Sequence, residues 1–183
     1  MTVSCALASS GRPLDALARY QLALDIWRRI GRTSQVAWTL YNIGSLRLFQ
    51  LSEAGAAREA LTEALAAART VQEPEAEGYA LHELGNVARL QGDARASLAR
   101  FDEALRLAQS IGSRELEYQV LADRGRALNA LGRGDEAITD LRESARIVND
   151  LRANVHSDVA KIAFVDPRPD VFQTLSPKLL AAG

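Results

Sequence analysis

The sequence predicts an all-α fold, a right-handed superhelical solenoid of antiparallel helix pairs. Two sets of positions recur with a common step of about 40 residues. The first set contains the small residues that follow each turn, Ala16, Ala57, Ser97 and Ala137. The second contains glycines inside the helix that precedes a turn, Gly44, Gly85 and Gly125. A fixed period in two registers is typical of a repeat array rather than of a single bundle.

Each small residue begins an apolar stripe. A large residue follows each of them four positions later, at Tyr20, Leu61, Phe101 and Leu141, and a small one seven positions later, at Ala23, Ala64, Ala104 and Ser144. This spacing predicts a helix with one buried face. Glycine inside a helix costs about 1 kcal/mol relative to alanine, so its repetition indicates a role in packing. We expect the glycine to let the paired helix approach at the small residue, while the large residue fills the gap to the next unit.

Seven helices are expected, joined by short turns that contain Gly, Ser or Pro. They cover residues 13–30, 34–50, 54–71, 75–91, 94–111, 114–131 and 135–155. The first, third, fifth and seventh carry the apolar stripe, and the others carry the in-helix glycines. The array of residues 1–155 divides into units at about 2–32, 33–73, 74–113 and 114–155. The first unit is too short for a full pair, so we expect a piece of a longer array or a shortened gene.

The tail, residues 156–183, breaks the period. Pro167 and Pro169 end any helix there. We expect a C-terminal capping helix and hairpin that shields the last repeat with the apolar residues Ile162, Phe164, Val165, Val171 and Phe172.

One set of residues carries a specific resemblance. Gly85, Gly92, Ser97, Phe101 and Ala104 resemble the tetratricopeptide repeat signature, and Gly125, Gly132, Ala137, Leu141 and Ser144 repeat it. The usual unit has about 34 residues. The longer unit seen here resembles the long-helix variant of bacterial regulators and kinesin light chains. The family's closing proline is matched well only by Pro74, and Gly44 to Ala57 is one residue longer than Gly85 to Ser97.

The tail has a second resemblance. Leu151-Arg152, Phe164 and Asp170-Val171-Phe172 resemble the segment that leads out of the repeats in bacterial proteins where a CHAT domain, a caspase-like peptidase fold, follows. None of the catalytic residues of such a peptidase lies in this chain.

Composition excludes several classes of function. The chain is 48% hydrophobic and 25% charged, with a net charge of −1, which is typical of a folded protein without a field for nucleic acid or an anionic membrane. Cys5 is the only cysteine, and the N-terminus has no signal-peptide pattern. We expect a cytoplasmic protein, and the Arg- and Ala-rich composition suggests a bacterial source.

We expect neither a catalytic site nor a cofactor or metal. Cys5, His82 and His156 lie too far apart along a solenoid to act together. His82-Glu83 is followed by Asn86 where the metalloprotease motif requires histidine. Gly132 and Gly134 follow a helix rather than a strand, so they indicate a turn and not a phosphate loop.

The resemblance implies a peptide-binding groove. In such arrays the first helix of each pair lines the concave side, at five positions around the in-helix glycine. By register these are Trp38, Tyr41, Ser45, Leu48 and Phe49, then Tyr79, His82, Asn86, Arg89 and Leu90, then Gln119, Ala122, Arg126, Asn129 and Ala130. Asn86 would bond the ligand backbone, and Arg89 and Arg126 could pair with a ligand carboxylate.

An alternative for these positions stays open. Trp38 and Phe49 could pack against an upstream repeat, Tyr41 could belong to the core, and the arginines could be ordinary solvated residues. The sequence therefore favours a protein- or peptide-binding scaffold. The alternative function is a recognition or sensor arm of a larger CHAT protein or transcription regulator. A homodimer through exposed solenoid ends is also possible.

Overall fold

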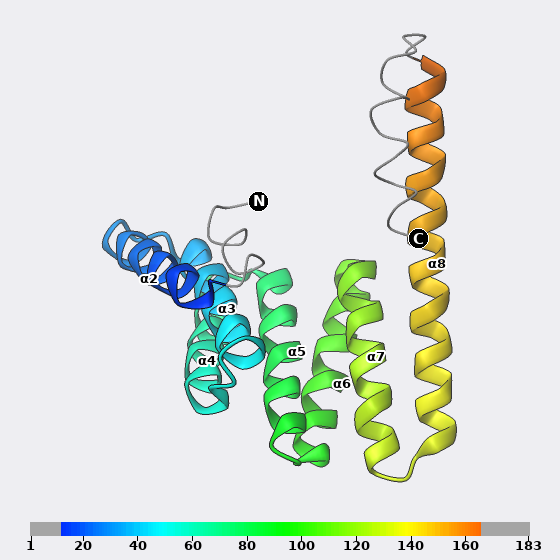
Figure 1. Cartoon of the computed structure of the whole chain (residues 1–183), viewed down its shortest axis with the longest axis horizontal. Helices are drawn as coiled ribbons and strands as arrows, with labels where there is room; N and C mark the ends of the chain where they lie inside the picture. Colours follow the sequence, from blue (N-terminus) through cyan, green and yellow to red (C-terminus); the bar gives the residue numbers. More distant parts are fainter. Residues whose placement is uncertain (1–11, 166–183) are drawn as a thin grey trace. The chain divides into compact units, whose positions relative to one another are not determined.

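A computed structural model describes the backbone of residues 12–165 and the side chains of residues 12–153. Within this part of the chain seven helices follow one another (Figure 1): α2 (Pro13–Arg29), α3 (Thr33–Phe49), α4 (Ala54–Thr70), α5 (Pro74–Leu90), α6 (Ala94–Ile111), α7 (Arg114–Ala130) and α8 (Gly134–Val165). Six of them match the expected ranges to within about one residue.

The last helix is longer than expected. α8 continues to Val165, whereas the repeat pattern predicts an end near residue 155. No proline or glycine occurs between residues 135 and 165, so nothing in the sequence stops the helix before Pro167. The expected capping segment therefore begins inside α8. Residues 166–183 and the side chains beyond residue 153 lie outside the described part, and the expected shielding of the last repeat lies there.

The chain divides after Ser144 into two compact units. The first contains α2–α7 and the first turns of α8, and the second contains the remainder of α8. In the first unit, α3 packs most extensively on α4, and α5 on α6. α3 also contacts α5, and α5 contacts α7. This unit is the expected all-α solenoid of sequential antiparallel pairs, in which the first helices of neighbouring pairs lie against each other.

The in-helix glycines accommodate a different partner from the expected one. A Cβ atom at Gly85 would lie only 2.5 Å from Cε1 of Phe101, which is the large residue of the paired helix α6. Gly44 faces Leu61 and Gly125 faces Leu141 in the same way. The glycine therefore makes room for the large side chain of its own pair, and at Gly44 and Gly125 the backbone carbonyl of the small residue, Ala57 or Ala137, also lies within 3.3 Å of the Cβ position. The small residues Ala16, Ala57 and Ser97 are fully buried.

The turns also follow the repeat. Gly92 and Gly132 adopt left-handed backbone angles, with φ of 81° and 75°. Both lie directly after a helix end, where the backbone N–H of Gly92 bonds the carbonyl of Arg89 at 3.0 Å. The left-handed conformation closes the helix and lets the next one return antiparallel.

Candidate functional site

The candidate site is the surface formed by the first helices of the pairs, which we call the α3–α5–α7 face. These helices contact their counterparts in the neighbouring units. The face therefore runs continuously across three repeats. It contains an aromatic group at the α3–α5 contact and a polar group at the α5–α7 contact.

The aromatic cluster consists of Trp38 and Tyr41 on α3 and Tyr79 on α5. Trp38 meets Tyr41 edge to face, with ring centroids 5.8 Å apart and planes at 89°. Tyr79 lies 5.7 Å from Trp38 and 5.6 Å from Tyr41, with planes tilted by 54° in both cases. All three side chains are half-buried. The cluster joins two repeats and leaves part of its aromatic surface exposed to a partner.

Two carboxylates influence the phenol of Tyr79. Burial, followed by the negative charges of Glu115 and Glu75, raises the pKa of Tyr79 to about 12. Glu75 lies one helical turn before Tyr79 on α5, and Glu115 occupies the equivalent position on α7. The aromatic cluster therefore borders an acidic region.

The polar cluster lies one turn further along α5 and α7. Its members are His82, Glu83 and Asn86 on α5 and Asp123 on α7. Oδ2 of Asp123 lies 2.9 Å from His82 Nε2 and accepts a hydrogen bond from Asn86 Nδ2 at 3.1 Å. Asn86 Nδ2 also donates to Glu83 Oε2 at 3.3 Å. His82 is 4% exposed and Asn86 is 1% exposed, so these bonds connect two repeats inside the protein.

Two arginines complete the polar cluster. Nε and Nη2 of Arg89 donate to Oδ1 of Asn86 at 3.3 and 3.2 Å. Arg126 forms an ion pair with Asp123. The cations expected to bind a ligand carboxylate therefore already have partners within the protein.

The pKa values of the two carboxyl groups in this cluster are shifted in opposite directions. Burial alone raises the pKa of Asp123, but the hydrogen bond and charge of His82, the Asn86 amide and the charge of Arg126 outweigh burial and lower the pKa to about 2. Burial raises the pKa of Glu83 more than His82 and Asn86 lower it. Asp123 is thus the ionised acceptor at the centre of the cluster.

The predicted groove positions differ in exposure from what the register indicated. Trp38, Tyr41 and Tyr79 come together and stay half-exposed, but His82, Asn86 and Leu48 are buried. The reason is that α5 contacts both α3 and α7, so positions close to the in-helix glycine face the neighbouring first helix. Gln119 is half-buried, and Arg126 and Asn129 are exposed.

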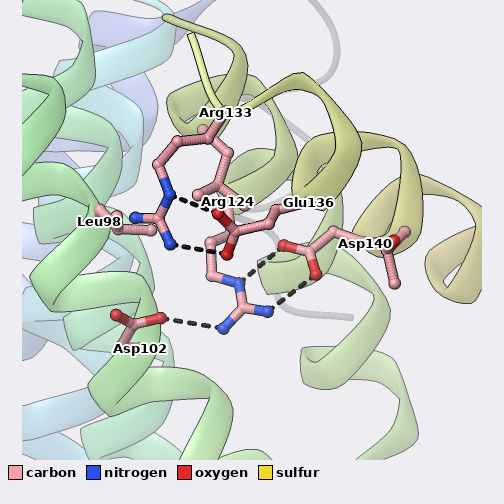
Figure 2. A pocket seen from close by; sticks show the side chains of 8 residues that line it. Leu98, Asp102, Arg124, Arg133, Glu136 and Asp140 are labelled. Atoms are coloured by element: carbon pink, nitrogen blue, oxygen red, sulfur yellow. Dashed lines mark hydrogen bonds and ion pairs between the residues drawn. The ribbon is translucent and has the colours of Figure 1, made fainter. Parts of the chain in front are cut away.

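Sequence reasoning missed a second polar group, which lines a pocket of about 250 Å³ between α6, α7 and the start of α8 (Figure 2). Nε and Nη2 of Arg124 donate to both carboxylate oxygens of Asp140, at 2.7 and 2.8 Å. Nη1 of Arg124 donates to Asp102 at 2.9 Å. Arg133 and Glu136 form another two-bond pair at the rim. The charged groups that line the pocket are hydrogen-bonded to one another. They therefore act as a brace that joins the helices.

A signal for this brace exists in the sequence. Arg124 directly precedes Gly125, whereas Ile43 and Leu84 precede the corresponding glycines of the earlier units. A cation at a register position that is otherwise apolar indicates a buried or half-buried carboxylate nearby. Here that carboxylate is Asp140, and its hydrogen bond and charge raise the pKa of Arg124.

The described residues also bear on the expected absence of a metal site. Among them no group of three or more His, Cys, Asp or Glu side chains is placed to hold a metal ion. Cys5 and the side chain of His156 lie outside the described part, so their separation is not tested. No helix of that part combines the length and apolar character needed to cross a membrane.

Comparison with known proteins finds a family match for the first part of the chain. Residues 6–70 match the tetratricopeptide repeat family. Domains of this family generally bind proteins or peptides and are typically non-catalytic. No curated protein matches the sequence at a significant level.

Several solved structures have the same fold as this chain. BtubC from P. vanneervenii has a TM-score of 0.71 at 20% identity, and the match covers 82% of this chain and 62% of that protein. Kinesin light chain repeats of Podosopora anserina give 0.65 at 14% identity, covering 98% and 90%. A signal transduction ATPase (STAND) from Pyrococcus horikoshii, whose tetratricopeptide repeats form a sensor, gives 0.67 at 17% identity. Its match covers 84% of this chain and 24% of that one. The chain thus spans less than two thirds of BtubC and about a quarter of the ATPase.

Proposed function

We propose that these tetratricopeptide repeats bind a peptide segment of another protein on the α3–α5–α7 face. The observation that carries the proposal is the aromatic cluster of Trp38, Tyr41 and Tyr79, which is half-exposed and joins two repeats. Aromatic rings provide large contact areas at low conformational cost and dominate the energetics of many interfaces.

The rest of the face supports this role. The polar cluster fixes α5 against α7 beneath the surface, so the aromatic rings are held in place before a partner arrives. A pre-organised surface loses less entropy on binding than a mobile one. Arg126, Gln119 and Asn129 remain accessible on α7 as polar contacts at the rim. We assign Asn86 to the support of the face rather than to ligand contact, because it is buried.

The test is a selection of random dodecapeptides displayed on phage, with the full chain as bait. Tyr79→Gln is the informative variant, since Gln119 occupies the same register on α7 and the repeat tolerates glutamine there. We expect Tyr79→Gln to weaken the selected peptide by about tenfold or more. Ile138→Gln, an exposed apolar residue of α8 away from the face, is the control and should leave affinity unchanged. Equal affinity of both variants would contradict the proposal.

A second candidate function is a sensor arm of a larger protein. The likeness to the sensor repeats of the ATPase, and the small share of that protein that the match covers, favour it. The long-helix and CHAT resemblances belong to this candidate, although Asp170, Val171 and Phe172 lie outside the described residues. Sequencing the gene beyond codon 183 tests it: an open reading frame that continues into a further domain is expected, and a stop codon there excludes a C-terminal one.

A cytoplasmic location and a homodimer through the solenoid end remain part of the proposal. α2 exposes the apolar side chains of Leu14, Leu22, Ile26 and Ile30, which gives an end-to-end contact a hydrophobic surface. Sedimentation equilibrium should then yield a mass that rises with concentration, and Leu22→Glu should return it to that of a monomer.

A further inference from the structure

A hollow opens where α5 begins, next to the aromatic cluster. It has a volume of about 370 Å³ and is lined by Glu73, Pro74 and Glu75 at the start of α5 and by Ile111 and Ser113 at the turn between α6 and α7. Two carboxylates and two apolar side chains thus surround one space. A long side chain with an aliphatic stem and a cationic end suits such a lining.

The two carboxylates of this hollow form no ion pair with a residue in the range 12–153. Glu73 accepts a hydrogen bond from the hydroxyl of Ser34 at 2.9 Å, and Glu75 has neither a hydrogen bond nor an ion pair there. Two arginines that lie close in the sequence pair with other carboxylates. Arg69 pairs with Glu77 at 2.7 Å, and Arg114 pairs with Glu117 at 2.7 Å. Glu73 and Glu75 form no ion pair within residues 12–153 and give the hollow a negative charge.

The hollow adjoins the aromatic cluster. Glu75 precedes Tyr79 by one helical turn, so both side chains lie on the same side of α5. Glu115, the equivalent residue on α7, adds a second negative charge near Tyr79, and its contact with Gln119 Nε2 at 3.5 Å brings no cation. A cation is attracted both by carboxylates and by the faces of aromatic rings.

We propose that the hollow receives an arginine or lysine side chain of a basic peptide segment, with Glu73 and Glu75 pairing its charge and Ile111 and Pro74 contacting its stem. The neighbouring residues of the segment then lie over Tyr79, Trp38 and Tyr41. This assignment rests on the proposed function and adds the chemistry of the partner. The charge of the hollow is the complement of the positive segment.

The dodecapeptide selection tests this assignment with two further variants. Peptides selected on the full chain should carry an arginine or lysine at a constant position. The double variant Glu73→Gln with Glu75→Gln should weaken them by about fivefold or more. Glu59→Gln, an exposed glutamate of α4, is the matched charge control and should change affinity little. Added salt should weaken binding to the unaltered chain and much less to the double variant.

Glutamine keeps an acceptor for the Ser34 hydroxyl, so the double variant should melt at the same temperature as the unaltered chain. Selected peptides without a cation, or an affinity equal in the double variant and the unaltered chain, would overturn the assignment. If Tyr79→Gln still weakens the binding of these selected peptides, the proposed function is supported although the assignment of the hollow is overturned. If binding depends on the cation but is unchanged by Tyr79→Gln, the assignment of the hollow is supported and the role of the aromatic cluster is contradicted. A selection that yields no binding peptide would overturn both proposals.

Discussion

The in-helix glycines share a register but differ in their surroundings. Phe101, which faces Gly85, is fully buried and packed on all sides. Leu141, which faces Gly125, is 45% exposed and can move outward. An alanine in a helix gains about 1 kcal/mol over glycine, while forcing a methyl group into a packed core costs about 1–3 kcal/mol. The balance of these two effects should therefore differ between the two sites.

We predict that Gly85→Ala lowers the free energy of unfolding by about 1–2 kcal/mol. Its Cβ would meet the Phe101 ring at 2.5 Å, whereas at Gly125 the nearest atom is 3.0 Å away. Gly125→Ala should stay within about 0.5 kcal/mol of the unaltered chain. Urea unfolding monitored by circular dichroism measures both, and an equal loss at the two sites would show that Leu141 is as constrained as Phe101.

Asp123 provides a prediction about pH. Its pKa is about 2 in the folded protein against 3.8 in the unfolded chain, so its contribution is fully present above pH 4 and disappears as pH falls through 2. Asp123→Asn should therefore cost about 2 kcal/mol at neutral pH and much less near pH 2. The raised pKa of Glu83 has the opposite effect on the pH dependence of stability, but Glu83 is present in both the unaltered chain and Asp123→Asn.

The measurement is a series of urea unfolding curves for Asp123→Asn and the unaltered chain between pH 7 and pH 2. Asp25→Asn, an exposed aspartate of α2, is the control and should show no comparable pH-dependent difference. A loss for Asp123→Asn that is the same at both ends of the series would mean that the charge of Asp123 does not contribute.

At the scale of helices, neighbouring elements are joined by two kinds of polar contact. The polar cluster joins α5 to α7, and Arg124 joins α7 to α6 and to the start of α8. Asp140 is only 6% exposed, so its carboxylate depends on Arg124 for compensation. In the unit of residues 33–73 the corresponding positions hold Ile43 and Ala60, an apolar pair.

We predict that Arg124→Ile destabilises the protein by about 2 kcal/mol, because Asp140 loses its partner. Adding Asp140→Ala should restore most of the loss, since the double variant reproduces the Ile43 and Ala60 pair. Arg133→Ala is the control: its pair with Glu136 is solvent-exposed and its loss should not be measurable. Thermal unfolding compares the three, and a double variant as unstable as Arg124→Ile would contradict the role of Asp140.

Helix positions were predictable because each depends on a local pattern. The stripe begun by Ala57 or Ser97 and the turn glycines Gly92 and Gly132 suffice to place α4, α6 and their neighbours. The length of α8 was misjudged because the repeat period ends while helix-compatible residues continue. The exposure of the site was harder to predict. His82 and Asn86 are buried and bond Asp123, which lies 41 and 37 positions further along the chain. A register that treats each repeat alone contains no such contact.

At the scale of the whole molecule, one recurrent unit produces both stability and a surface. Stacked pairs bury the small residues and, at Leu61 and Phe101, the large residues that face the glycines, and they place α3, α5 and α7 side by side in the first compact unit. Side chains that differ between repeats then give the face its chemistry. Trp38 and Tyr79 are aromatic where Gln119 is polar, and Glu75 and Glu115 are acidic where Ser34 is neutral. The solved structures are less than a quarter identical in sequence to this chain and support its fold. The differences between repeats support the proposal about the partner.

The most direct test of the account is to locate a bound peptide on the protein. Backbone amide signals of the nitrogen-15-labelled full chain are followed while a selected dodecapeptide is added. The account predicts that the largest shifts occur around Trp38, Tyr41 and Tyr79 and at Glu75 and Ser113, and that α4 and α6 outside the turn change little. Shifts concentrated on the outer surfaces of α4 and α6, with the aromatic cluster unchanged, would contradict it.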